Sequence, residues 1–174
     1  MSESRSVGTG LRQPSEAAPG PAMLRRGLAV AAVVVVLDQL SKLWVRASLL
    51  QPLRDIEVTP FFKLIYTENR GVSFSMFHSD SPAGPWLLSA LALAIVAALL
   101  WWLRRVDRLL PALAIGLVIG GAVGNVIDRL RLGGVVDFLY FHLGDYYWPA
   151  FNLADSAISV GVVALLADGL FRRS

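Results

Sequence analysis

Residues 154–171 read ADSAISVGVVALLADGLF, an apolar run with an aspartate, Asp155, in its second position. A helix needs about 20 predominantly apolar residues to cross about 30 Å of hydrocarbon. The run approaches that length. It therefore predicts a membrane-spanning helix with a carboxylate at its mouth, where the ionised form of an acid is costly.

Three blocks of similar length precede this run: Gly27–Trp44, Pro85–Leu103 and Leu110–Ile127. The composition agrees, since 55% of the 174 residues are hydrophobic and 17% are charged, with a mean hydropathy of +0.58. We predict an integral membrane protein, mainly α, whose single domain of four transmembrane helices occupies residues 23–174. We interpret residues 1–22, rich in Ser, Gly, Pro and Ala, as a disordered cytoplasmic tail.

The basic residues argue against a nucleic-acid partner, although the formal net charge is +3. They cluster at the ends of the predicted helices, in the groups Arg25–Arg26, Arg104–Arg108 and Arg172–Arg173. These groups fall on one side of the membrane if the four helices alternate in direction. Because cytoplasmic loops carry an excess of Lys and Arg, we expect both termini to be cytoplasmic.

The segment 50–83 links the first two helices on the opposite side of the membrane. Asp55–Thr59 and Val72–Met76 alternate between polar and apolar residues, Phe61–Thr67 is rich in β-forming residues, and Glu68–Gly71 is typical of a turn. This pattern predicts a β-hairpin or small sheet on the outer membrane surface.

Polar residues of the predicted helices fall at one depth, near the outer surface. Asp38, for example, follows Arg26 by twelve residues, or about 18 Å of helix. The layer contains Asp38, Lys42, Asp128, Arg129, Asp137, Asn152 and Asp155. Ionisable groups in a membrane usually face a protein interior or a water-filled cavity, so this layer is a candidate site.

Several members of the layer also have a structural interpretation. Asp38 and Lys42 form an i,i+4 acid–base pair that stabilises a helix and neutralises both charges, which is the role we favour for them. Asn152 is a good N-cap, and Asp155 then occupies the third helical position, as in a capping box. Spacing alone leaves Asp155 open as a cap or as a catalytic group.

One stripe of the third helix combines small and polar residues. Its members, at positions i, i+3, i+4 and i+7, are Gly121, Gly124, Asn125 and Asp128. Close helix packing explains the glycines, and Gly116 and Gly120 add a second small-residue pair. Close packing explains the two polar members of the stripe, Asn125 and Asp128, less well.

Asp137 lies in the apolar, strand-like run Val-Val-Asp-Phe-Leu and has no capping duty. A buried carboxylate there would stay protonated unless it were paired. Two neighbouring carboxyl groups can divide labour, because the ionised one activates water while the protonated one polarises a carbonyl. This aspartic-protease chemistry requires Asp137 and Asp155 to meet in space.

Other chemistries find less support. The sequence has no cysteine, no H-E-x-x-H or G-x-S-x-G motif, and no zinc-like partner spacing for His78 or His142, so we expect neither a metal nor a cofactor. Two alternatives to a peptidase remain: a small proton-coupled transporter or channel subunit, and a noncatalytic scaffold that associates through Gly116–Gly124.

Five motifs follow one another along the chain. They are Asp38-Gln-Leu-Ser-Lys42, Asn69-Arg-Gly-Val-Ser-Phe-Ser75, Gly121-Ala-Val-Gly-Asn-Val-Ile-Asp-Arg129, Val135-Val-Asp-Phe138 and Phe151-Asn-Leu-Ala-Asp-Ser156. Through them the chain resembles the lipoprotein signal peptidases, also called signal peptidase II, from about Leu24 to Phe171. It departs from the family at Val72-Ser73, where small residues are common.

The resemblance implies an aspartic endopeptidase of the bacterial cytoplasmic (inner) membrane, with its active site near the outer face. Its substrates would be diacylglyceryl-modified prolipoproteins, cut just before the lipidated cysteine, and globomycin-type peptides would bind the same site. We expect it to be a monomer surrounded by membrane lipids.

The same resemblance assigns roles to individual residues. It implies Asp137 and Asp155 as the catalytic pair, and Asp38 and Lys42 as a supporting polar pair. Residues that would shape the site or hold substrate are Asn69, Gly121, Asn125, Asp128, Arg129 and Asn152. Our hypothesis for the pair is that Asp155, in the first turn of its helix, is the base and Asp137 holds the proton.

Overall fold

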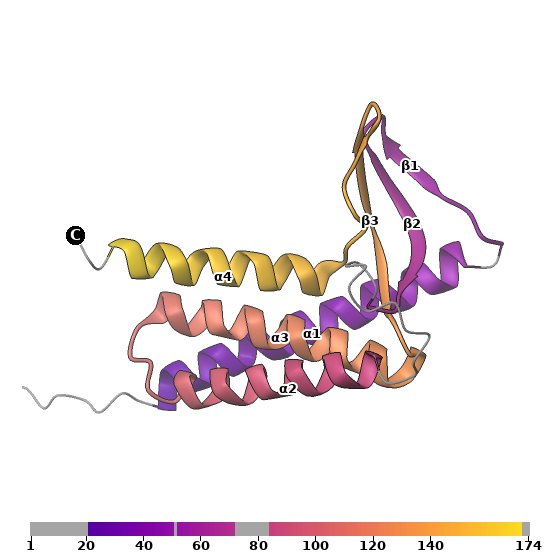
Figure 1. Ribbon diagram of the computed structural model, residues 1–174. Helices are drawn as coiled ribbons and strands as arrows, with labels where there is room; N and C mark the ends of the chain where they lie inside the picture. Colours follow the sequence, from indigo (N-terminus) through magenta and orange to yellow (C-terminus); the bar gives the residue numbers. More distant parts are fainter. Residues whose placement is uncertain (1–20, 51, 72–83, 172–174) are drawn as a thin grey trace, which may run out of the picture.

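A computed structural model of the protein describes residues 21–50, 52–71 and 84–171. Over these residues the chain forms four helices: α1 (Pro21–Leu49), α2 (Gly84–Leu103), α3 (Leu109–Leu132) and α4 (Leu153–Phe171). Each is long and apolar enough to cross a membrane, as predicted, and they lie side by side in a bundle (Figure 1).

Some boundaries differ from the sequence-based expectation or lie beyond the described residues. α1 begins at Pro21, so the last two residues of the predicted tail are helical, while residues 1–20 are outside the described part. The predicted strand Val72–Met76 is also outside it. Proline in the first turn of a helix loses no intrahelical hydrogen bond, which explains how Pro21, Pro85 and Pro111 sit at helix starts.

α3 is the central helix and packs against each of the other three. Of its apolar span, 72% is buried, against 28% or less for the other helices. Glycines allow this close approach, as predicted. A Cβ at Gly120 would lie 2.7 Å from the carbonyl oxygen of Ala31 in α1, and a Cβ at Gly116 would overlap the backbone of Gly27.

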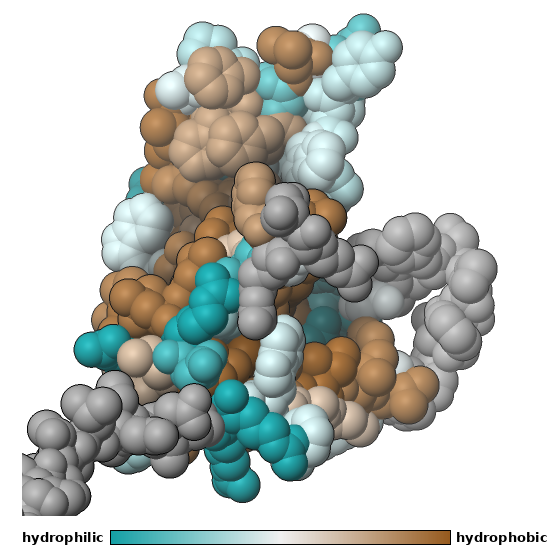
Figure 2. Space-filling view, turned by 90° about the vertical axis from the view of Figure 1, so that its left-hand side faces the viewer, coloured by the Kyte–Doolittle hydropathy of each residue, from teal (hydrophilic) through white to brown (hydrophobic). Residues whose placement is uncertain are grey.

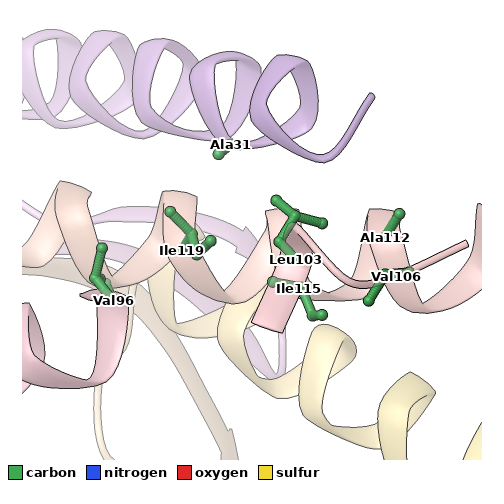
Figure 3. Close-up of a cluster of buried hydrophobic side chains, with 8 residues drawn as sticks. Ala31, Val96, Leu103, Val106, Ala112, Ile115 and Ile119 are labelled. Carbon is green, nitrogen blue, oxygen red and sulfur yellow. The ribbon is translucent and has the colours of Figure 1, made fainter. Parts of the chain in front are cut away.

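The main apolar core joins α1, α2 and α3 through interlocking aliphatic side chains (Figure 3). Its fully buried members are Leu103, Ala112 and Ile115. Most other large apolar side chains of the helices face outward, where lipid would cover them. In Figure 2 broad hydrophobic surfaces are visible beside the hydrophilic helix ends.

Those hydrophilic helix ends carry two of the three predicted basic clusters, and the third, Arg172–Arg173, lies outside the described residues. Arg25 and Arg26 at the start of α1 lie at the same end of the bundle as Arg104, Arg105 and Arg108 (Figure 1). Arg108 also ties the start of α3 to the end of α4, because its guanidinium donates two hydrogen bonds, of 2.8 and 2.6 Å, to Asp168.

A small antiparallel sheet stands across the other end of the bundle (Figure 1). Its described strands, in spatial order, are β1 (Ile56–Thr59), β2 (Phe62–Asn69), β3 (Val135–Leu143) and β4 (Tyr146–Tyr147). The described part of the predicted β element, residues 52–71, thus supplies β1 and β2. The remaining strands come from the loop before α4. The β2–β3 register places Thr67 opposite Asp137 and Asn69 opposite Val135.

Candidate active site

Among the described residues, four carboxylates gather where the sheet meets the bundle, each from a different element. They are Asp38 of α1, Asp128 of α3, Asp137 of β3 and Asp155 of α4. The first three are at least 97% buried, whereas Asp155 is half-buried. Hydrogen bonds through Lys42, Asn125 and Asn152 join them, so the polar residues that the helical rise placed at one level meet in one cluster.

Asp155 sits in a capping box at the start of α4, as its spacing from Asn152 predicted. The side-chain oxygen of Asn152 accepts a hydrogen bond from the Asp155 backbone N–H at 3.0 Å. In return, Oδ2 of Asp155 accepts one from the Asn152 backbone N–H at 3.2 Å. This reciprocal pair satisfies two N–H groups and fixes the carboxylate relative to the helix start.

The side-chain amide of Asn152 connects Asp155 to Asp137. Its Nδ2 donates to Oδ1 of Asp137 at 2.7 Å, and it also lies 3.2 Å from Oδ1 of Asn125 and 3.3 Å from the Val136 carbonyl. One fully buried residue therefore contacts both carboxylates. The two aspartates that the sequence singled out separately belong to one polar cluster.

Asn125 holds the other oxygen of Asp155. Its Nδ2 donates to Asp155 Oδ1 at 2.8 Å, while its own Oδ1 accepts from Lys42 Nζ at 3.1 Å. Asn125 is buried, and these contacts fix which way its amide points. Both oxygens of Asp155 consequently face N–H donors, an arrangement suited to an ionised carboxylate.

Lys42 forms the centre of a buried ion cluster with Asp38 and Asp128. Its ammonium lies 2.8 Å from an oxygen of each carboxylate. The second oxygen of Asp38 accepts from the Ala154 backbone N–H at 3.0 Å, so α1 supplies a cap to the start of α4. Asp128 accepts from the Val136 backbone N–H at 3.2 Å. The cluster thereby positions α4 and β3, the elements that carry Asp155 and Asp137.

Two glycines of the α3 stripe make room for this arrangement. A Cβ at Gly124 would lie 2.5 Å from Oδ2 of Asp38, and a Cβ at Gly121 would overlap the Ala154 carbonyl of α4. Packing therefore explains both glycines, while Asn125 and Asp128 of the same stripe face polar partners.

The pKa of Asp137 is raised from its ordinary value near 3.8 to about 6. Burial is the largest cause and the negative charge of Asp155 the second, whereas hydrogen bonds from Asn69 and Asn152 oppose the shift. The carboxyl group of Asp137 therefore exchanges its proton in the near-neutral range.

The remaining predicted residues lie around this centre. Asn69 ends β2 beside β3, and its side chain accepts from the Gly71 backbone N–H at 2.9 Å. Arg129 lies on α3 with Nη1 3.5 Å from the Asn125 carbonyl, close enough for its charge to interact with Asp128, Asp137 and Asp155. All ten predicted site residues therefore fall in or beside the polar cluster.

Sequence reasoning did not single out Gln39. Its Nε2 donates to Asp128 Oδ1 at 2.9 Å and lies 3.3 Å from the Gly124 carbonyl, so it ties α1 to α3. Gln39 lies inside the Asp38–Lys42 motif, which was the only signal in the sequence. One turn later in the same helix stands the apolar Leu43, so no polar i,i+4 pair indicated Gln39.

Comparisons with known proteins agree over most of the chain. The family described as Signal peptidase (SPase) II matches residues 30–171. A lipoprotein signal peptidase of Beijerinckia indica is 47% identical over 143 residues, covering 82% of this chain and 85% of its own. A lipoprotein signal peptidase of Azoarcus sp. (strain BH72) is 52% identical over 141 residues, and the match covers 80% of this chain and 79% of that one.

A solved structure supports the same assignment. It is described as a bacterial membrane enzyme determined by the in meso method at 2.3 Å resolution, and it is 28% identical with a TM-score of 0.72. The match covers 85% of this chain and 89% of that one. With its four spans, its small sheet and the family match over 142 residues (30 to 171), the chain belongs to the signal peptidase II family of membrane peptidases.

Proposed function

We propose that the protein is an aspartic endopeptidase that removes signal peptides from prolipoproteins, with Asp137 and Asp155 as its catalytic pair. One observation carries the proposal: a buried carboxyl group with a raised pKa and a second, hydrogen-bonded carboxylate both contact Asn152. The curated relatives are named lipoprotein signal peptidases, which supports the substrate class.

The two carboxyl groups then take different roles. Asp155, whose oxygens accept N–H bonds from Asn125 and Asn152, acts as the base and takes a proton from a water molecule. Asp137, the group with the raised pKa, donates its proton in a hydrogen bond to the scissile carbonyl. The resulting hydroxide attacks the carbonyl carbon. Collapse of the tetrahedral intermediate breaks the C–N bond, and the proton that Asp155 took from water passes to the leaving amine.

The depth of the site fits a lipidated substrate. The polar cluster lies at the sheet end of the bundle, opposite the basic helix ends. We place those basic ends in the cytoplasm of a bacterium and the cluster near the outer face of its cytoplasmic membrane. A substrate held in the outer leaflet by a diacylglyceryl-modified cysteine would present the peptide bond before that cysteine at this depth. Water is close enough there to be the nucleophile.

The positions of the acidic residues argue against a proton-coupled transporter. Such a protein needs acids through the membrane depth. Among the described residues, α2 contains no acidic residue, the acids of α3 and α4 lie near helix ends, and Asp38, which lies within the span of α1, belongs to the same polar cluster as Asp128.

Cleavage of a diacylglyceryl-modified prolipoprotein by the purified protein tests the proposal. Asp137→Asn and Asp155→Asn should each lower the rate by about 10²–10⁴-fold, the usual contribution of a positioned acid or base. Asp168→Asn, at the opposite end of the bundle, is the matched control and should cleave normally. Cleavage by both site variants at the wild-type rate would refute the aspartic mechanism, and an unlipidated substrate cut equally well would refute the lipid requirement.

A further inference from the structure

A shallow cleft lies between α1 and α3 at the sheet end of the bundle. Its α1 wall is a single helical stripe at i, i+3, i+4 and i+7: Gln39, Lys42, Leu43 and Arg46. Its α3 wall is a stripe at i, i+3 and i+4: Asp128, Arg131 and Leu132. Two facing helices thus contribute matched polar and apolar groups to one concave surface.

Two arginines that line the cleft, Arg46 and Arg131, have no carboxylate partner within 4.0 Å among the described residues. Lys42 is paired with Asp38 and Asp128. Arg131 is exposed, and its Nη1 lies 3.5 Å from the side-chain oxygen of Gln39. Two unpaired arginines on facing helices form a binding surface for an anion.

The position of the two arginines along the helices places them at the level of lipid headgroups. Arg46 follows Arg26 by twenty residues, which is about 30 Å of helix and matches the hydrocarbon thickness. Arg131 follows Arg108 by 23 residues, or about 34 Å. Each helix therefore carries arginines at both boundaries of its apolar span.

An apolar surface continues from the cleft toward the middle of the membrane span. Leu43 lines the cleft and is 48% exposed, and Leu40, on the same outward side of α1, is 57% exposed. A ligand that fits has an anionic head for the arginines and an acyl chain for the leucines. An inorganic anion would contact only the arginines and would leave the leucines uncovered.

We propose that this cleft binds the headgroup phosphate of an anionic phospholipid, with Arg46 and Arg131 as its ligands. A guanidinium offers paired N–H donors that match phosphate oxygens, and one guanidinium from each helix would hold the headgroup between α1 and α3. The diacylglyceryl group of the proposed substrate carries no phosphate, so the two ligands are chemically distinct. The inference rests on the membrane fold and does not depend on the peptidase activity.

Native mass spectrometry of the full-length protein tests the proposal. The protein, released from nanodiscs of equal phosphatidylglycerol and phosphatidylcholine, should retain phosphatidylglycerol preferentially. Arg46→Gln/Arg131→Gln should lower that retention by about 25-fold, or about fivefold for each basic residue lost near an anionic lipid. Arg25→Gln/Arg26→Gln, which removes two exposed arginines at the other end of α1, is the matched control and should lower it much less.

Three results would overturn the proposal: no preference for phosphatidylglycerol, equal losses in both double variants, or displacement of the lipid by millimolar inorganic phosphate. The last result would indicate a site for a free anion. Arg46→Lys/Arg131→Lys keeps the charge and should retain an intermediate amount of lipid. If the double variant fails to fold, Arg131→Gln alone, at an exposed position, should still lower retention about fivefold.

Discussion

Asn152 and Asp155 cap each other's backbone at the start of α4, through hydrogen bonds of 3.0 and 3.2 Å. The side-chain Nδ2 of Asn152, which takes no part in the cap, donates a hydrogen bond of 2.7 Å to Oδ1 of Asp137. The arrangement that begins the helix is therefore the same one that holds the two carboxyl groups of the proposed catalytic pair together. Asp155 serves as a cap and is available as a catalyst, so the two interpretations left open by its spacing are compatible.

Replacing Asn152 separates these two duties. Asn152→Ser keeps an oxygen suited to capping but removes the amide that reaches Asp137. The cleavage rate should fall about 2–10-fold, the loss expected for one hydrogen bond to a neutral carboxyl group. Asn152→Ser and Asn152→Ala should both lower the melting temperature because they remove the buried amide contacts. Asn152→Ala should lower stability by about 1 kcal/mol more than Asn152→Ser, because it also removes the cap. Cleavage assays with thermal unfolding check both, and wild-type activity in Asn152→Ser would contradict this account.

Asp137→Asn should inactivate the protein and stabilise it at neutral pH. The pKa of Asp137 is raised from 3.8 to about 6, so the folded state favours the protonated form. The free energy of unfolding of the wild type should therefore be highest below pH 4 with respect to this group. It should fall between pH 4 and about 6 and stay at the lower value above that range. Asp137→Asn has no carboxyl group to ionise, so its free energy of unfolding at pH 7 should exceed that of the wild type by roughly 1–3 kcal/mol.

Thermal unfolding at several pH values measures this difference. The melting temperatures of wild type and Asp137→Asn should converge near pH 4 and separate as the pH rises. A constant gap from pH 4 to 8 would show that Asp137 does not titrate in this range. Asp145→Asn, at an exposed position in the same outer loop, serves as the control.

Gly121→Ala should displace the start of α4. The added methyl group would overlap the Ala154 carbonyl and lie 2.7 Å from a side-chain carbon of Ile158. We expect a loss of roughly 1–3 kcal/mol in stability and a clear loss of cleavage, because Asp155 moves with α4. Gly169→Ala, in α4, meets no atom within 4 Å and should be neutral or slightly stabilising. Equal effects of the two substitutions would contradict the packing argument.

Lys42→Met should destabilise the protein by about 3–5 kcal/mol. The substitution leaves Asp38 and Asp128 buried without their shared cation. Adding Asp128→Asn removes one of the unpaired charges and should recover part of the loss. Denaturation in detergent measures both variants, and a double variant no more stable than Lys42→Met would contradict the argument that the loss comes from an unpaired Asp128.

Asp168→Asn should weaken the end of the bundle far from the site. It breaks the paired hydrogen bonds from Arg108, which join α3 to α4. Because Arg108 is partly exposed, the cost should be about 1 kcal/mol or less. The cleavage rate should remain that of the wild type, and a loss of activity at unchanged stability would reveal coupling along α4.

The helices and the depth of the polar layer could be predicted because both follow from local rules. Apolar run lengths indicate the spans, and the rise per residue places Asp38 and Asp128 near one membrane boundary. The capping box of Asn152 and Asp155 was also readable, since its members are three residues apart.

Contacts between distant segments could not be predicted in this way. The pairing of β2 with β3 joins residues about seventy positions apart, so the alternating pattern of β2 does not indicate its neighbour. The cap that Asp38 provides for Ala154 spans 116 residues and depends on how α1 and α4 sit on α3. Gln39 was missed for the same reason, because its partners lie on another helix.

The pairing of Lys42 with Asp38 within one helix has a consequence for membrane insertion. α1 is synthesised before α3, yet it carries two ionisable residues in its apolar span. Because the two residues are one turn apart, α1 can neutralise its own charges as it leaves the ribosome. Asp128 can join Lys42 only when α3 is present, and the Lys42–Asp38 contact is kept in the assembled bundle, so α3 adds a partner to a pair that α1 can form alone.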